Sequence, residues 1–187
     1  IRSCYEYVSF LEEYLGELPN LTRAYPEEAR VTAPIETWSD DFSMAIAGIP
    51  SMVNDFTGGS FMETHYHSQF DNESFYDEQV YRLHHELFAL LLLTLDETAV
   101  VPLDFTPVAE RARRGLHKCR ELWNGPAAHV LSAQRQELTE RLEQADRLCM
   151  QLEERCRTEY ERLCAYNREY RKLLRAGETE RAEELYC

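Results

Sequence analysis

Residues 131–176 read LSAQRQELTE RLEQADRLCM QLEERCRTEY ERLCAYNREY RKLLRA, and this stretch decides the fold. It contains no glycine and no proline, the residues that most often interrupt a helix. Apolar side chains recur mostly at steps of three, four or seven, as at Leu138, Leu142, Ala145, Cys149, Leu152 and Cys156. This spacing predicts one long helix, or two with a tight break, presenting a narrow seam to a partner helix. At 1.5 Å per residue it would approach roughly 65 Å, more than a small domain covers alone.

The sequence before this stretch predicts further helices and a short strand. Apolar spacing of three and four predicts helices at 3–18 and 76–95. An N-cap at residues 39–41 and a glycine at 48 predict a short helix at 42–47, and the stop signal at 124–126 ends a helix at 108–123. The wide apolar face of residues 76–95 predicts packing on a sheet, and the apolar run 49–56 predicts a short buried strand. The expected fold is therefore mostly helical, with some α/β character before residue 106.

Charge is unevenly distributed along the 187 residues, whose net charge is −14. Residues 1–108 carry 19 acidic and 4 basic side chains, whereas residues 109–175 carry 11 acidic and 15 basic ones. This shift near Pro107 is typical of a domain boundary. The acidic first part argues against nucleic acid as a partner, because phosphate binding needs a basic surface. The longest apolar run, residues 87–95, is far shorter than the roughly 20 residues of a membrane span.

The six cysteines show no CxxC pair and no spacing typical of a zinc finger. Cys149, Cys156 and Cys164 lie on the apolar stripe of the long helix, where a thiol acts as a small hydrophobic side chain. The pattern favours free thiols and a reducing compartment, although it does not identify that compartment. The chain begins with Ile1 and has no basic-then-apolar opening, so we expect it to be a piece of a longer protein.

Residues 61–77 hold the densest group of metal-ligand side chains, including His65, His67 and Asp71. Imidazole and carboxylate are ligands that zinc prefers, and loops at strand ends often carry sites. The spacing alone does not establish a metal site, because a His-x-His pair in an acidic loop is more often surface polarity.

The segment Tyr66-His67-Ser68-Gln69-Phe70-Asp71-Asn72 resembles the Tyr-His-Ser/Thr-x-x-Asp/Glu-Thr/Asn segment of the glutamate carboxypeptidase II and transferrin receptor family. Two further segments follow the family's order. Ser39-Asp40-Asp41-Phe42, with Gly48-Ile49-Pro50 after it, is similar to the pocket loop, helix and strand, and residues 101–105 resemble the exit from the peptidase domain. The resemblance is specific over residues 36–105 and rests on order and helicity over 106–187.

The resemblance implies that residues 1–105 are the C-terminal part of a zinc-peptidase α/β domain and residues 106–187 an all-α dimerisation domain. His67 would be the last ligand of a two-zinc centre, and Tyr66 would donate a hydrogen bond to the oxyanion of the tetrahedral intermediate. Asp40 would face the substrate pocket, and Asp71 would orient His67 through its other ring nitrogen. The implied partners are a peptide substrate and a second copy of the chain, bound through residues 106–175.

The other family ligands are missing from the sequence, because Glu12-Glu13 and Glu27-Glu28 lack the expected histidine and aspartate before them. We therefore expect this chain to supply one zinc ligand to a longer exopeptidase, aminopeptidase or carboxypeptidase, and to be inactive alone. One alternative is a non-catalytic homodimerisation or interaction module of the transferrin receptor type. Another is a stand-alone helical protein that binds metal adventitiously through His65, His67 and Asp71.

Overall fold

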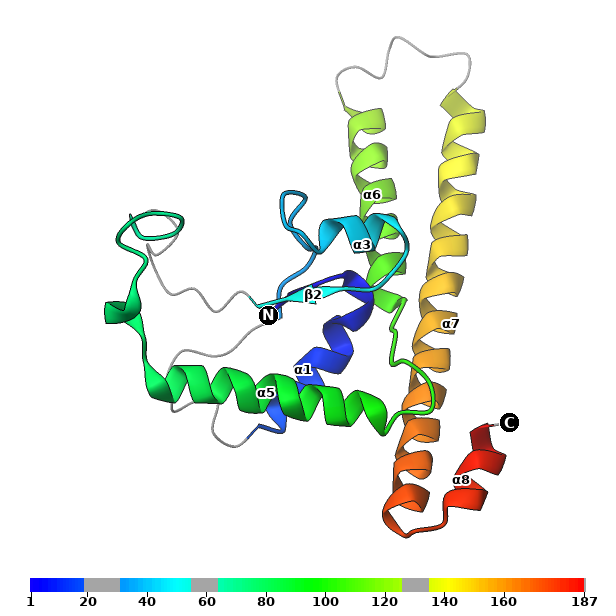
Figure 1. Ribbon diagram of the computed structural model, residues 1–187. Coiled ribbons are helices and arrows are strands. Elements are labelled where there is room, and N and C mark those ends of the chain that lie inside the picture. Colours follow the sequence, from blue (N-terminus) through cyan, green and yellow to red (C-terminus); the bar gives the residue numbers. More distant parts are fainter. Residues whose placement is uncertain (19–30, 55–63, 126–134, 187) are drawn as a thin grey trace.

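The computed structural model describes residues 1–18, 31–54, 64–125 and 135–186, and most of these residues are helical (Figure 1). This confirms the expectation of a mostly helical chain. The helices and strands, in chain order, are β1 (Arg2–Ser3), the 3-10 helix η1 (Tyr5–Tyr7), α1 (Val8–Gly16), α3 (Phe42–Ile46), β2 (Met52–Val53), the 3-10 helix η2 (Glu73–Phe75), α5 (Glu78–Asp96), α6 (Thr106–Asn124), α7 (Arg135–Arg175) and α8 (Thr179–Tyr186).

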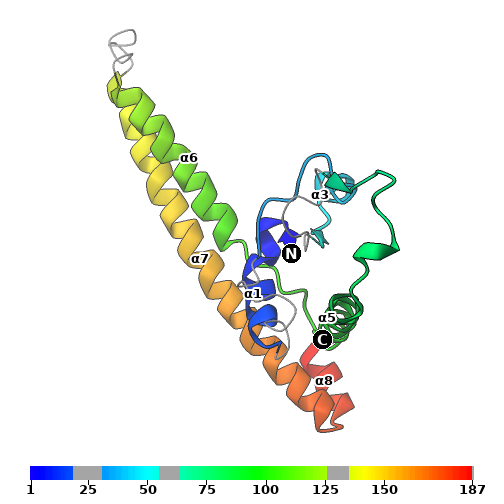
Figure 2. The same ribbon diagram turned by 90° about the vertical axis from the view of Figure 1, so that its left-hand side faces the viewer.

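The stretch expected to form one or two helices is the single 41-residue helix α7. It runs alongside α6 in a hairpin, named here the arm, that projects past the rest of the molecule (Figures 1 and 2). Arg113 of α6 bridges the two helices, because its guanidinium lies 3.1 Å from a carboxylate oxygen of Asp146 and 3.5 Å from one of Glu153. Helix α7 thus has a partner helix within the same chain, although Leu152 of its predicted seam is 51% exposed.

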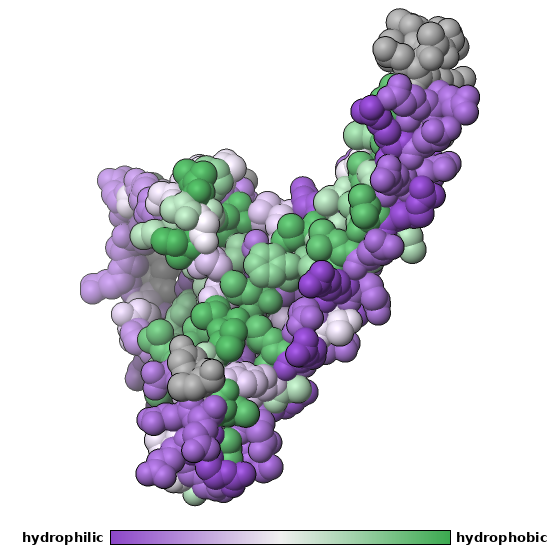
Figure 3. Space-filling view, turned by 90° about the vertical axis from the view of Figure 1, so that its right-hand side faces the viewer, coloured by the Kyte–Doolittle hydropathy of each residue, from purple (hydrophilic) through white to green (hydrophobic). Residues whose placement is uncertain are grey.

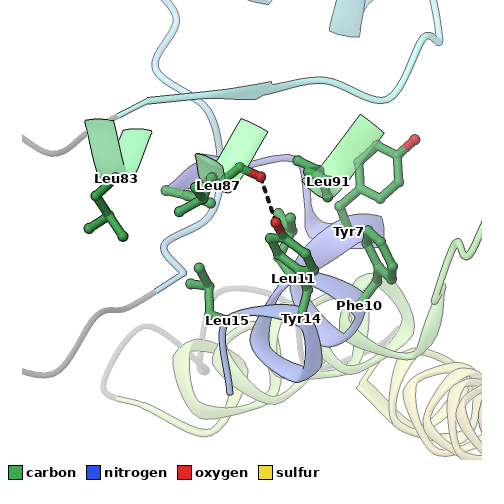
Figure 4. Packing of buried hydrophobic residues seen from close by; sticks show 9 residues of the cluster. Tyr7, Phe10, Leu11, Tyr14, Leu15, Leu83, Leu87 and Leu91 are labelled. Carbon is green, nitrogen blue, oxygen red and sulfur yellow. Dashed lines mark hydrogen bonds between the residues drawn. The ribbon is translucent and has the colours of Figure 1, made fainter. Parts of the chain in front are cut away.

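The hydrophobic core lies in the described residues up to 105, named here the body, where α1 packs across α5 (Figure 4). Leu11 and Leu87 are the most deeply buried leucines, at 0% and 1% exposure. The Tyr14 hydroxyl donates a hydrogen bond to the Leu87 carbonyl oxygen at 2.5 Å, which satisfies the buried phenol. Helix α5 was expected on a sheet, but its buried leucines meet α1 instead.

The sheet of the body consists, among the described residues, of the two short antiparallel strands β1 and β2. Arg2 is opposite Val53, and Ser3 is opposite Met52. The strand expected over 49–56 is thus shorter, with residues 55 and 56 outside the described part of the chain. Two strands of this length expose too little apolar surface to accommodate the wide face of α5, and a helix–helix contact takes that role.

The arm and the body are joined by hydrogen bonds on both sides of the expected boundary at residue 105. Asn167 of α7 accepts a hydrogen bond from the Val100 N–H at 3.1 Å and donates one to the Val100 carbonyl oxygen at 2.8 Å. The Ser9 hydroxyl of α1 donates to Asp104 at 2.6 Å, and Asp104 accepts from the first N–H of α6 at 2.8 Å. The division into residues 1–105 and 106–187 remains a prediction.

The C-terminal end turns back along α7. Gly177, with a φ of 76°, adopts the left-handed conformation that follows many helices, and α8 begins two residues later. Ala182 of α8 is fully buried, and the Tyr166 hydroxyl donates a hydrogen bond to the Leu185 carbonyl oxygen. Within the described ranges, no helix combines the length and the apolar character that crossing a bilayer requires.

Candidate functional site

The Tyr66–His67 segment forms a series of tight turns between residues 64 and 72. The Ser68 N–H and hydroxyl both donate to the His65 carbonyl oxygen, at 3.0 and 2.6 Å. The Asp71 N–H donates in turn to the Ser68 carbonyl oxygen at 3.1 Å. His67 has a φ of 54°, the left-handed conformation that residues other than glycine adopt rarely. Local hydrogen bonds therefore hold the turn that displays the two predicted site residues.

Both predicted site rings are exposed at the surface of this turn. Tyr66 is 43% exposed and His67 is also exposed. Their rings stack on each other, with centroids 3.9 Å apart and planes 18° apart. His65, two positions earlier, is half-buried, and its Nδ1 is hydrogen-bonded to the Thr64 hydroxyl. The His67 imidazole is thus directed to solvent, where an incoming ligand can reach it.

The other two predicted site residues have different positions relative to this turn. Asp71 is exposed in the same turn, and its carboxylate makes no hydrogen bond to His67 in the described part of the chain. Asp40 is exposed just before α3, where its carbonyl oxygen accepts from the Ser43 hydroxyl at 2.8 Å. Figure 1 shows α3 well separated from the segment that leads into α5. The structure therefore places Tyr66, His67 and Asp71 in one turn and Asp40 elsewhere.

The described residues do not by themselves fit a zinc centre. Zinc needs three or four protein donors, usually in a tetrahedral arrangement. No group of three or more histidine, cysteine, aspartate or glutamate side chains in residues 1–18, 31–54, 64–125 and 135–186 is placed to hold a metal ion. A centre that uses His67 would therefore need donors from outside these residues.

The cysteines of the described residues are free, and two of them, Cys4 and Cys164, are poor nucleophiles. Burial raises the pKa of the Cys4 and Cys164 thiols above the ordinary value, which keeps them protonated near neutral pH. Burial also raises the pKa of the Tyr160 hydroxyl beside Cys164. Cys164 and Tyr160 line a small space between α1, α5 and α7 and belong to the packing between body and arm.

Sequence reasoning missed a row of exposed aromatic rings at the start of α5. Tyr76, Tyr81 and His85 contact one another in series, with ring centroids 5.3 and 4.4 Å apart. The spacing of these residues could have indicated the contact. Tyr81 and His85 are four positions apart and so lie on one helix face, and Tyr76 stands just before the helix begins. Only the distances reveal that the three rings form one surface.

The chain was compared with known proteins in three ways. A scan against protein-family models, a search of curated proteins and a search of solved structures each find no match to the chain.

Proposed function

We propose that the chain is the C-terminal portion of a co-catalytic zinc exopeptidase similar to glutamate carboxypeptidase II, to which it contributes His67 as one zinc ligand. The proposal is carried by the exposed Tyr66–His67 turn, whose rings stand at the surface rather than in the α1–α5 core. A metal ligand needs an accessible ring nitrogen, and a group buried in packed hydrocarbon would not offer one.

The neighbouring residues have matching roles in this proposal. Tyr66 carries its hydroxyl on the same turn, where it would donate a hydrogen bond to the oxyanion of a bound peptide during hydrolysis. Asp40 would contact the substrate from the loop before α3, whereas Asp71 makes no hydrogen bond to His67 among the described residues and has no role in this proposal. The remaining zinc ligands would come from polypeptide outside this sequence, so the chain alone should neither bind a zinc pair tightly nor hydrolyse peptides.

The test compares two histidine variants of the intact protein that contains this chain. His67→Ala should lower the zinc content and abolish hydrolysis of short peptides, because one metal ligand is lost. The matched control is His65→Ala, two positions away in the same turn, which should keep both properties. Zinc is measured by elemental analysis and hydrolysis by release of the terminal amino acid. Unchanged zinc content and hydrolysis in His67→Ala would refute the assignment.

A second candidate is a homodimerisation or interaction module without catalysis. The observation that favours it is the exposed apolar surface of the arm, where Leu148 and Leu152 are 57% and 51% exposed. Figure 3 shows apolar surface running along part of the arm and onto the rest of the molecule. Such surface usually marks an interaction site. A protein of this class would self-associate yet show no zinc-dependent hydrolysis in its intact form.

A further inference from the structure

Three exposed rings at the start of α5 form a continuous surface, named here the aromatic strip: Tyr76, Tyr81 and His85. Tyr76 is 59% exposed and Tyr81 is 53% exposed. The Tyr76 and Tyr81 rings are tilted by 58°, and the Tyr81 and His85 rings by 54°. Exposed tyrosine rings in mutual contact are typical of recognition surfaces, because a tyrosine offers a large contact area at low conformational cost.

Local hydrogen bonds fix the strip. The Tyr76 N–H donates to the Glu73 carbonyl oxygen at 3.0 Å, which closes η2 immediately before α5. The Asp77 side chain caps α5 by accepting from two backbone N–H groups. Further along the helix, His85 Nδ1 lies 2.9 Å from the Tyr81 carbonyl oxygen. These bonds set the backbone that carries the three rings and orient the His85 ring, which reduces the ordering that binding requires.

The sequence that carries the strip is strongly acidic. Residues 64–86 include five acidic side chains and one basic one. That single cation, Arg82, is engaged by Glu86 at 3.0 Å. Asp71, Glu73, Asp77 and Glu78 have no basic residue of the segment to balance them. The surface therefore attracts cations and disfavours acidic ligands.

We propose that the aromatic strip and its carboxylates bind a lysine or arginine side chain of a peptide. The faces of aromatic rings attract cations, and the methylene stem of such a side chain packs on apolar surface while its charged end reaches the carboxylates. A purely apolar ligand would leave the carboxylates unused, and an acidic one would be repelled. This inference goes beyond the proposed peptidase, because the binding requires neither His67 nor a metal.

The experiment titrates the full chain, with EDTA present, with three blocked tripeptides and follows the tyrosine resonances by NMR. The peptides are Ala-Lys-Ala, Ala-norleucine-Ala, which keeps the stem but lacks the charge, and Ala-Glu-Ala. Saturable shifts at Tyr76 and Tyr81 should occur with the lysine peptide only, and added salt should weaken them. Equal shifts with all three peptides, or none with the lysine peptide, would overturn the proposal.

Two variants identify the residues responsible. Tyr81→Leu keeps an apolar helix side chain but removes the ring, and Glu78→Gln removes a charge at almost constant shape. Each should weaken binding of the lysine peptide by about two- to fivefold, the range expected for one exposed cation–ring or ion contact. Trp38→Leu is the matched control, because Trp38 is an aromatic residue 70% exposed outside the strip. Unchanged binding in both strip variants, or an equal loss in the control, would refute the assignment.

Discussion

At the scale of single residues, Asn167 joins the arm to the body through both ends of its amide. The side chain is 2% exposed and forms two hydrogen bonds with the backbone of Val100, sixty-seven positions away. The Asn167 amide thus pairs with both the backbone N–H and the carbonyl oxygen of Val100, as a neighbouring strand would. A buried amide with this arrangement stabilises one relative position of the loop and α7.

We predict that Asn167→Ala lowers the free energy of unfolding by about 1 to 3 kcal/mol, because two partly buried backbone groups lose their partner. Urea denaturation followed by circular dichroism measures the change. Gln151→Ala, an exposed amide in the same helix, is the control and should shift stability by less than about 0.5 kcal/mol. Equal losses in the two variants would show that the Val100 contact contributes nothing specific.

His84 gives a prediction about pH. Burial, and to a smaller extent the neighbouring charge of His85, lowers the pKa of His84. The folded state therefore favours the neutral His84 ring, whereas in the unfolded chain the ring takes up a proton at its ordinary pKa of about 6.5. The stabilisation is fully present above that pH and is lost as the pH falls through it towards the lower folded pKa. As the pH falls from about 7 to about 5, the free energy of unfolding should decrease more steeply in the wild type than in His84→Gln. Parallel pH profiles would contradict this.

Residues that contact their sequence neighbours can be recognised from the sequence, whereas residues that contact distant parts of the chain cannot. Asp77 stands before an apolar periodic run, and it caps α5. The periodic helix that starts near it was therefore predictable. Asn167 has the polar character of an ordinary surface position on α7. Its burial depends on a loop far away in the chain, which no local pattern encodes.

At the scale of elements, helices α1, α3, α5, α6 and α7 lie close to their expected ranges. Apolar spacing was the signal for α1, α5 and α7, and start or stop residues were the signal for α3 and α6. The partner of α5 was predicted wrongly. A wide apolar face predicts that the helix is buried but does not identify the element that covers it. In the structure, Leu83, Leu87 and Leu91 pack in one core cluster with residues of α1. Helix α8 was not predicted at all. It has eight residues and one fully buried side chain, Ala182, too little pattern to distinguish it from a polar tail.

The contact of α6 with η1 gives the prediction at this scale. Ala109, in the first turn of α6, is 3% exposed, and α6 contacts η1, so a larger side chain at this buried position would have little room. Ala109→Leu should lower the free energy of unfolding by about 1 to 3 kcal/mol through overpacking. The matched control, Ala112→Leu, lies on the exposed part of the same helix and should be close to neutral. Thermal denaturation distinguishes the two. Similar melting temperatures for both variants would mean that the contact tolerates a large side chain.

At the scale of the whole molecule, the sequence names the residues of the candidate site but does not determine how they are arranged in space. The Tyr66–His67 turn depends on hydrogen bonds within a few residues, and its composition was visible in the sequence. The relation of Asp40 to His67 depends on how α3 and the segment before α5 pack, which their local sequences do not determine. Figure 1 shows α3, which follows Asp40 in the chain, apart from the segment that leads into α5. A shared site would therefore need additional polypeptide between or around them.

The arm provides the last prediction, which concerns self-association. Leu148 and Leu152 lie four positions apart on one face of α7, and Met150, 48% exposed, points to another face. We expect the full chain to form a homodimer, which the double variant Leu148→Glu/Leu152→Glu should convert to a monomer, because charges placed in an apolar contact lose their hydration. Met150→Glu is the control and should remain dimeric. Sedimentation velocity over a concentration series measures the change. A monomeric wild type would contradict dimerisation through the arm, and a dimeric double variant would place the contact on another surface.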